Sequence, residues 1–545
     1  MIVIPIQCLN LNYPAVFRLS LLVLPALVGW APGLSGQKIH QSEPLTLPAA
    51  SVPYSAAESD GQLYYYTNVP LAQSTDNEPH LSRVPPIWAK GEETITVPLE
   101  LNHDGQPLAF EALVVLDNRL FVLGTRRTRV SNNVHLYVQE HDAVTLERTV
   151  RPWLIDMIKG ASVREDRFWR LAVSPDRRRA AIVRQDRQSA TKLGVYAKIF
   201  DRNFEPVDHH RTYFTPVANQ GARSVLDPVL LDDNRVVVPV VETLGPASAT
   251  VPPPSRAYLL TFTPDQQPAL RHLLNKKGYS PGYPRVLIEH DGSIVVAGHF
   301  RRDALSGKTA GFYRKRFAGS DLSVTDEAML HLGASPDGRN LTTADRSFGS
   351  ELPGALTQNL SLEKLIADGR GGHFLVASRC YFTQQDDRPV GYRQYNRRHL
   401  VVSHLAADGT TNWIRVISRH TSLYDTDNNK LGFAATARDG QLHLLINDHP
   451  KNRRRPAHRA RLLTDAGPRC SRLITIAASG EVRKRTIHKR IRKGGEFFPQ
   501  RAILAATDGY LRALYRAETG QAVVLSVPLQ EQDRRLAQTK TARRR

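Results

Sequence analysis

The stretch EALVVLDNRLFVLG (111–124) decides the fold of this chain. Two apolar runs, EALVVL and LFVLG, stand on either side of Asp117-Asn118. A two-residue hairpin loop of type I′ needs positive φ at both central residues, which Asn, Asp and Gly accept most readily. The stretch is therefore predicted to form two antiparallel strands joined by a tight turn.

The same turn mark recurs along almost the whole chain, at steps of 57, 59, 57, 58, 77, 71 and 69 residues. Its members are Asp60-Gly61, Asp117-Asn118, Asp176, Asp233-Asn234, Asp291-Gly292, Asp368-Gly369, Asp439-Gly440 and Asp508-Gly509. Asp176-Arg177 is the weakest member, because Arg tolerates positive φ poorly. A fixed period of this size indicates a repeat architecture.

A second hairpin with a polar turn follows most of these marks, for example VHLYVQEHDAVTLERTV (134–150). Two hairpins per unit make four strands, which is the composition of a β-propeller blade. The sequence thus predicts an all-β fold, a single propeller over 37–530. Eight blades fit the marks best and seven are the alternative, with a strand from 45–56 closing the ring. One short helix is expected in TVRPWLIDMIKG (149–160), from apolar residues four apart.

The segment SPDRRRAAIVR (174–184) resembles the SPDG repeats of TolB-like bacterial propellers. The resemblance to exported bacterial propeller proteins covers about residues 45–530. It implies an architecture and an exported protein, and it implies no particular activity.

The N-terminus predicts export. Arg18 precedes the apolar stretch LSLLVLPALVGWA (19–31), and small residues follow. This pattern favours a cleaved signal peptide over 1–36, with a retained anchor as the alternative. The mature chain is then expected to be secreted or periplasmic, monomeric and without a transmembrane segment. The basic tail 531–545 is predicted to be disordered.

Cysteine use leaves two thiols after that cleavage, Cys380 and Cys470. They fall in neighbouring units, and an oxidising compartment would permit a disulfide between them. Two separate buried thiols are the alternative.

A formal net charge of +21 is concentrated late in the chain. Residues 451–495 hold fifteen Lys or Arg against Asp465 and Glu481 alone. The predicted polyanion-binding residues are Arg453, Arg454, Arg455, Arg483, Lys484 and Arg485. Nucleic acid is not expected as a partner, because no nucleic-acid-binding motif accompanies the charge. An anionic polysaccharide or a protein partner fits an exported chain better.

Ligand sites of propellers gather where loops leave the second strand of a blade and enter the first. The candidate ligand-binding residues at those positions are Arg126, Glu242, His299, Arg301, Arg379, Tyr381, Asp448, His449 and Arg516. The guanidinium group of arginine can donate two parallel hydrogen bonds to the carboxylate of an acidic ligand. No nucleophile elbow, zinc-protease motif or phosphate loop occurs, so the catalytic residues, if any, stay unknown.

No metal or cofactor is expected. Asp425-Thr426-Asp427 imitates the start of a calcium loop, but Lys430 stands where an EF-hand needs Gly. Asp208-His209-His210 is typical of a solvated strand end, because neighbouring strand residues point to opposite faces. The leading interpretation is an exported, non-catalytic binding or scaffolding propeller that engages an anionic glycan or a protein. A carbohydrate-active lyase or hydrolase and a cell-envelope assembly scaffold are the alternatives.

Overall fold

The computed structural model describes most residues from His40 to Leu529. Its longest gaps are 42–51, 69–78, 161–168, 215–222, 245–253, 302–308, 333–359, 385–392, 425–431, 456–459, 492–495, 498–502, 506–509 and 517–521. The predicted signal peptide, the tail 531–545 and the calcium-like loop lie outside the described residues. Within them, no helix is long and apolar enough to cross a membrane.

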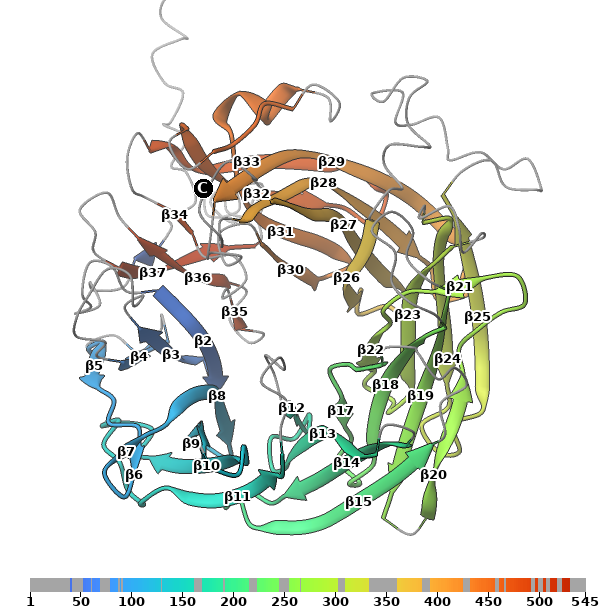
Figure 1. The fold of residues 1–545 in the computed structure, drawn as a ribbon. Coiled ribbons are helices and arrows are strands. Elements are labelled where there is room, and N and C mark those ends of the chain that lie inside the picture. Colours follow the sequence, from blue (N-terminus) through green and yellow to red (C-terminus); the bar gives the residue numbers. More distant parts are fainter. Residues whose placement is uncertain are drawn as a thin grey trace, which may run out of the picture. The chain divides into compact units, whose positions relative to one another are not determined.

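The described strands pair into eight sheets of four or five strands, accompanied by one two-stranded hairpin. Seven sheets are made from consecutive strands, and the eighth joins the last strands of the propeller to its first. Figure 1 shows the sheets as blades arranged in a ring, with β2, β8, β12, β26, β30 and β35 on its inner side. The predicted β-propeller with four-stranded blades is confirmed.

Blades 1 to 4 follow one another along the chain. Blade 1 is β2 (Val52–Ser59), β3 (Gln62–Asn68), β4 (His80–Val84) and β5 (Ile95–Pro98). Blade 2 is β8 (Ala109–Leu116), β9 (Arg119–Arg127), β10 (Val134–His141) and β11 (Trp153–Ile158), preceded by the hairpin β6 (Asn102–His103) and β7 (Gln106–Pro107). Blade 3 is β12 (Trp169–Val173), β13 (Ala180–Ser189), β14 (Lys192–Phe200) and β15 (Pro206–Phe214). Blade 4 is β16 (Arg223–Val225), β17 (Val229–Leu230), β18 (Val236–Thr243), β19 (Ser255–Thr263) and β20 (Gln266–Leu273).

Blades 5 to 8 continue the ring. Blade 5 is β21 (Ser280–Pro281), β22 (Arg285–Ile288), β23 (Ile294–Arg301), β24 (Gly311–Phe317) and β25 (Val324–His331). Blade 6 is β26 (Leu360–Ala367), β27 (His373–Gln384), β28 (Arg393–Leu405) and β29 (Thr411–Tyr424). Blade 7 is β30 (Phe433–Arg438), β31 (Gln441–Asp448), β32 (Arg469–Ile476) and β33 (Val482–Ile491), with the 3-10 helix η2 (Pro450–Arg454). Blade 8 is β34 (Glu496–Phe497), β35 (Ile503–Ala505), β36 (Tyr510–Arg516), β37 (Ala522–Pro528) and β1 (His40–Gln41).

Two of the marks have the positive φ at both turn residues that the sequence predicts, whereas Asp233-Asn234, Asp291-Gly292 and Asp368-Gly369 have it at the second residue alone. Asp117 and Asn118 have φ of 45° and 61°, and Asp439 and Gly440 have 52° and 74°. Arg177 also has positive φ, 56°. Its strained backbone is held in place from both sides: its carbonyl accepts from Asp117 N at 2.9 Å, and its guanidinium pairs with Glu58 at 2.6 Å.

Two sequence expectations are wrong. The strand that closes the ring is β1, where His40 lies opposite Ser526, and not a strand from 45–56. That segment overlaps β2, which is the first strand of blade 1. The expected helix within 149–160 is the outer strand β11, which pairs with β10. Apolar residues four apart occur in strands too, and pairing with a neighbouring strand overrides the helical pattern.

The apolar core lies between successive blades. One cluster joins Phe121 of blade 2 to Phe200 and Phe204 of blade 3, and the rings of Phe121 and Phe204 lie 4.8 Å apart. Equivalent clusters join the pairs of neighbouring blades from blade 1 to blade 7. Apolar burial between sheets therefore stabilises the ring.

Arginines add a second, polar link between neighbouring blades. Arg314 of blade 5 donates to the carbonyl of Ala406 in blade 6 at 3.0 Å. Arg415 of blade 6 donates to the Gly480 carbonyl in blade 7 at 2.7 Å. Arg485 of blade 7 donates to the Pro528 carbonyl in blade 8 at 2.8 Å. We call these contacts arginine latches, and they account structurally for part of the chain's high arginine content.

Candidate functional site

The two ends of each blade differ in the connections they carry. At one end, which we call the connection face, the second strand passes to the third and the fourth passes to the next blade. At the other, the turn face, lie the tight turns such as Asp117-Asn118 and Asp439-Gly440. Most of the candidate ligand-binding residues lie toward the connection face, where the sequence placed them.

On blades 2 and 4, two candidates engage a tyrosine of the neighbouring strand. The guanidinium of Arg126 lies 5.7 Å from the ring centre of Tyr137. Glu242 is buried and accepts a hydrogen bond from the Tyr258 hydroxyl at 3.2 Å. These contacts hold both side chains within their own blades.

On blade 5, His299 and Arg301 are two positions apart on β23, so they project from the same face of the strand. Burial, together with the nearby Arg301, lowers the pKa of His299 to about 4. His299 is thus neutral at physiological pH. Its ring packs directly over Gly282, where a side chain would collide with it.

Blade 6 carries a compact basic group. Tyr381 has the guanidinium of Arg379 5.2 Å from its ring centre and that of Arg398 6.0 Å away. Burial lowers the pKa of His399 to about 3, and the nearby Arg379, Arg398 and His420 contribute to this shift. The sequence identified Arg379 and Tyr381, whereas Arg398, His399 and His420 come from the third and fourth strands and were missed.

Blade 7 places Asp448 and His449 at the end of β31. Asp448 is fully buried, and its carboxylate accepts from Arg472 Nη1 and from Asn452 Nδ2, both at 2.7 Å. Asn452 also accepts from Arg461 N at 2.6 Å, which secures the basic connection between β31 and β32. Burial lowers the pKa of His449, with Arg461, Lys451 and Arg455 adding to the effect.

The basic connection of blade 7 is bound to the outer strand of blade 6. Leu463 forms a parallel bridge with Thr421 of β29. Leu463 N donates to the carbonyl of His420 at 2.8 Å, and Ser422 N donates to the carbonyl of Leu463 at 2.9 Å. These contacts join the blade 7 connection to β29 of blade 6 along one joint. We call this joint the seam, and we count with it the basic residues of the two segments, Arg379 and Arg398 of blade 6 and Lys451, Arg453, Arg455 and Arg461 of the connection.

The two acids beside the seam each have an arginine partner. Glu363 accepts from Arg397 Nη1 at 2.7 Å and from the Ser378 hydroxyl. Asp448 pairs with Arg472. Arg419, which is 1 % exposed, is attracted by both Glu363 and Asp448, although burial lowers its pKa to about 10.

The predicted polyanion residues do not form one group. Arg453 and Arg455 belong to the seam, but Arg483, Lys484 and Arg485 open β33 next to the turn face. In register they lie opposite Thr475 to Leu473, about six strand positions or roughly 20 Å from the connection face. The two groups lie apart because 483–485 stand at the start of β33, which runs from Val482 to Ile491.

The remaining candidate residues lie on blades 6, 7 and 8. Arg516 lies in β36 opposite Glu496, and its side chain is outside the described residues, as is that of Arg454. Cys380 and Cys470 are free thiols rather than a disulfide. Each thiol instead lies beside an arginine of its own blade, Cys380 beside Arg397 and Cys470 beside Arg472. Over the described part of the chain, no group of three His, Cys, Asp or Glu could hold a metal ion.

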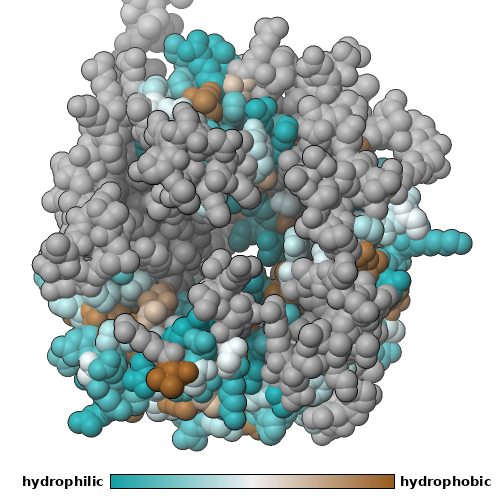
Figure 2. All heavy atoms as spheres, in the orientation of Figure 1, coloured by the Kyte–Doolittle hydropathy of each residue, from teal (hydrophilic) through white to brown (hydrophobic). Residues whose placement is uncertain are grey.

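Exposed apolar side chains are spread over several blades. Figure 2 shows the described surface on the viewed face as mainly hydrophilic, with hydrophobic residues in small separate spots. The large exposed ones include Val144, Val173, Val207, Leu273, Tyr283, Val324 and Leu462.

Comparison with known proteins adds little beyond the fold. No protein-family model and no curated protein matches the chain. Similar solved structures include the β-propeller domain of the Trilobed protease from Pyrococcus furiosus, with 11% identity, TM-score 0.34, and 78% of this chain and 96% of that chain covered. The polysaccharide lyase Uly1 shares 11% identity at TM-score 0.36, with 91% of this chain and 99% of that chain covered. A family-43 endo-arabinanase from Bacillus licheniformis shares 12% identity at TM-score 0.23, covering 52% and 94%. Likeness at this level carries no argument about activity, and the TolB-like repeat type stays a prediction.

Proposed function

We propose that this chain is an exported, non-catalytic binding protein that holds an anionic polysaccharide along the seam. The observation that carries the proposal is the hydrogen-bonded joint at Leu463, which fixes the basic connection of blade 7 against β29 of blade 6. Cations from two blades then face a ligand together, and a rigid surface of this kind binds without ordering a loop first.

The chemistry of the seam suits acidic sugars. Arginine guanidinium groups form two parallel hydrogen bonds to a carboxylate or a sulfate. Tyr381, with Arg379 and Arg398 close to its ring, offers an aromatic edge on the same surface. A polymer with repeated anionic groups would meet several such cations at once, which multiplies weak contacts into useful affinity.

Catalysis at the seam is the weaker candidate. A general acid or base works best with a pKa near the operating pH. His399, with a pKa of about 3, is far from that range. Glu363 and Asp448 are each paired with an arginine, Arg397 and Arg472. Burial raises the pKa of Asp448, but this carboxyl is fully buried against Arg472 and Asn452, so it is not exposed to a sugar as the acid of a glycoside hydrolase must be.

The test is binding of the mature chain, residues 37–545, to neutral and acidic oligosaccharides by titration calorimetry at low and high salt. A seam variant carries Arg379→Ser, Arg398→Ser and Arg453→Ser. A control variant carries Arg483→Ser, Lys484→Ser and Arg485→Ser, which removes the same charge from the turn-face end of blade 7. Melting temperatures of both variants establish that they fold.

We expect the wild type to bind acidic oligosaccharides with an affinity that falls as the salt concentration rises. The affinity of the seam variant should be lower by about tenfold or more. The control variant should keep most of the affinity. Equal losses in both variants would mean that net charge alone attracts the ligand, and absence of binding to any acidic glycan would refute the proposal. Release of shortened or unsaturated products would favour the lyase or hydrolase alternative instead.

A further inference from the structure

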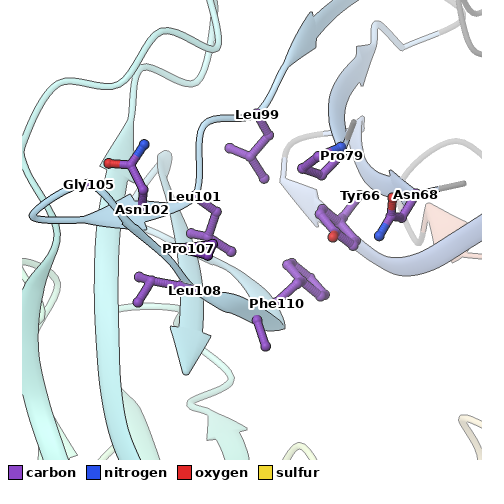
Figure 3. Close-up of a pocket in the computed structure, with 11 residues that line it drawn as sticks. Tyr66, Asn68, Pro79, Leu99, Leu101, Asn102, Gly105, Pro107, Leu108 and Phe110 are labelled. Carbon is purple, nitrogen blue, oxygen red and sulfur yellow. The ribbon is translucent and has the colours of Figure 1, made fainter. Parts of the chain in front are cut away.

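A cavity of about 590 Å³ opens between blades 1 and 2, away from the seam in sequence. It lies at the connection face, because its walls come from the end of β3, the residue before β4 and the passage from β5 to β8. Figure 3 shows Tyr66, Pro79, Leu99, Leu101 and Phe110 around it. Its volume is within the range of pockets that hold small ligands.

The lining is uncharged. Its eleven residues are Tyr66, Asn68, Pro79, Leu99, Leu101, Asn102, Gly105, Pro107, Leu108, Ala109 and Phe110. In a chain of which 23% is charged and whose net charge is +21, such a lining marks a place distinct from the basic seam. An ionic ligand would lose its hydration here without gaining a partner, so the lining disfavours charged ligands.

The walls combine an aromatic platform with polar amides. The rings of Tyr66 and Phe110 are stacked, with centres 3.6 Å apart and planes within 3°. Asn68 and Asn102 are also among the lining residues, and Figure 3 shows Asn68 beside Tyr66 and Asn102 on the side of Leu101. A sugar ring has the matching surface: apolar C–H faces that stack on aromatic rings, and hydroxyl groups that bond to amides.

The cavity is held open by its own backbone. Leu99 N donates to the Pro79 carbonyl at 2.8 Å, and Leu108 N donates to the Leu101 carbonyl at 2.9 Å. Leu101 and Leu108 pack over Gly124 of β9, where the Cβ of any larger residue would lie 3.0 Å from the Cβ of Leu108. The hairpin of β6 and β7 closes the passage between these two leucines. A ligand would therefore enter a preformed site.

We propose that this cavity is a binding site for one or two units of a neutral saccharide. The inference goes beyond the seam and does not depend on it, since it rests on different residues, an uncharged lining and a different pair of blades. The two sites share the connection face, so a mixed polymer with acidic and neutral units could engage both.

The probe is a set of neutral hexasaccharides, a β-1,4-glucan, an α-1,5-arabinan and a β-1,4-galactan, titrated while tyrosine and tryptophan fluorescence is followed. Phe110→Ala removes half of the aromatic platform, and Ala109→Trp fills the exposed rim of the cavity. Tyr213→Ala removes an exposed tyrosine of blade 3 as the matched control. Thermal melting of every variant separates lost binding from lost folding.

Support requires that at least one neutral hexasaccharide binds with an affinity that salt does not change. Phe110→Ala should weaken it by about tenfold, Ala109→Trp should abolish it, and Tyr213→Ala should leave it unchanged. The seam variant should also leave it unchanged, which distinguishes this site from the proposed polyanion surface. Binding of an apolar dye but of no saccharide would overturn the proposal, as would saccharide binding that survives Ala109→Trp.

Discussion

At the scale of single residues, the most constrained groups are the buried arginines. Arg314, Arg419, Arg472 and Arg512 are among the largest side chains with less than 2 % exposure. Burying a guanidinium is costly unless a partner compensates for its lost hydration. Arg472 has three such partners, since it donates to Asp448 and to the carbonyls of His449 and Pro450. These carbonyls belong to the turn that starts the seam.

Removing the charge of Asp448 should be strongly destabilising. Asp448→Asn keeps the shape of the side chain but leaves Arg472 buried without its counter-charge, so we expect the free energy of unfolding to fall by about 3–5 kcal/mol. Urea denaturation followed by circular dichroism measures it. Glu481→Gln, which breaks the exposed pair with Arg483, is the control and should change nothing measurable. Equal effects of the two substitutions would contradict the assignment.

At the scale of elements, the sequence predicts the positions of the tight turns, but it does not predict which strands pair. Asp117-Asn118 predicts a hairpin because few residue pairs accept positive φ twice. By contrast, Leu154 and Ile158 suggested a helix, since the spacing of a few apolar residues cannot show that β10 offers an edge. The seam was also beyond prediction, because the contact between Leu463 and Thr421 depends on how a long connection folds back onto another blade.

The arginine latches should contribute to stability individually. Arg415→Ala removes the donor to the Gly480 carbonyl and the guanidinium that lies 5.8 Å from the Trp413 ring. A hydrogen bond from a charged donor contributes about 1.5–3 kcal/mol, so the melting temperature should fall by several degrees. Arg202→Ala, at an exposed arginine paired with Asp117, is the comparison and should leave the melting temperature nearly unchanged. If Arg415→Ala left the melting temperature unchanged, apolar packing alone would join blades 6 and 7.

At the scale of the whole molecule, buried histidines predict acid sensitivity. Burial is the main cause that lowers the pKa of His299 and His443 to about 4 and that of His399 to about 3. Their unfolded pKa is about 6.5, so the unfolded chain takes up protons first as the pH falls. This stability is fully present above about pH 6.5 and is lost as the pH falls toward 4. Melting temperatures between about pH 7.5 and pH 4.5 measure the effect.

A single histidine can be tested against that trend. His443→Gln removes one titrating group while a polar partner for Thr475 is retained. The slope of melting temperature against pH should be shallower in this variant than in the wild type. A melting temperature that does not depend on pH in either protein would contradict the prediction.

Closure of the ring predicts the effect of truncation. Among the residues that the structure describes, two pairs join β1 to β37, His40 with Ser526 and Gln41 with Leu525. A chain that begins at residue 42 should melt roughly 2–4 °C lower than one that begins at His40, because the outer edge of blade 8 is then left unpaired. Differential scanning calorimetry of the two chains checks this. Equal melting temperatures would show that β1 is dispensable for closure.

The antiparallel pairing of β1 with β37 has a consequence for where the polypeptide needs to begin. Because His40 lies opposite Ser526, a turn of a few residues from Leu529 back to His40 would form an ordinary hairpin. The gene could then be circularly permuted, with fresh termini at another boundary between blades and the same sheets restored. The ring therefore fixes which blades are neighbours, whereas the blade at which the chain begins is set by the gene alone.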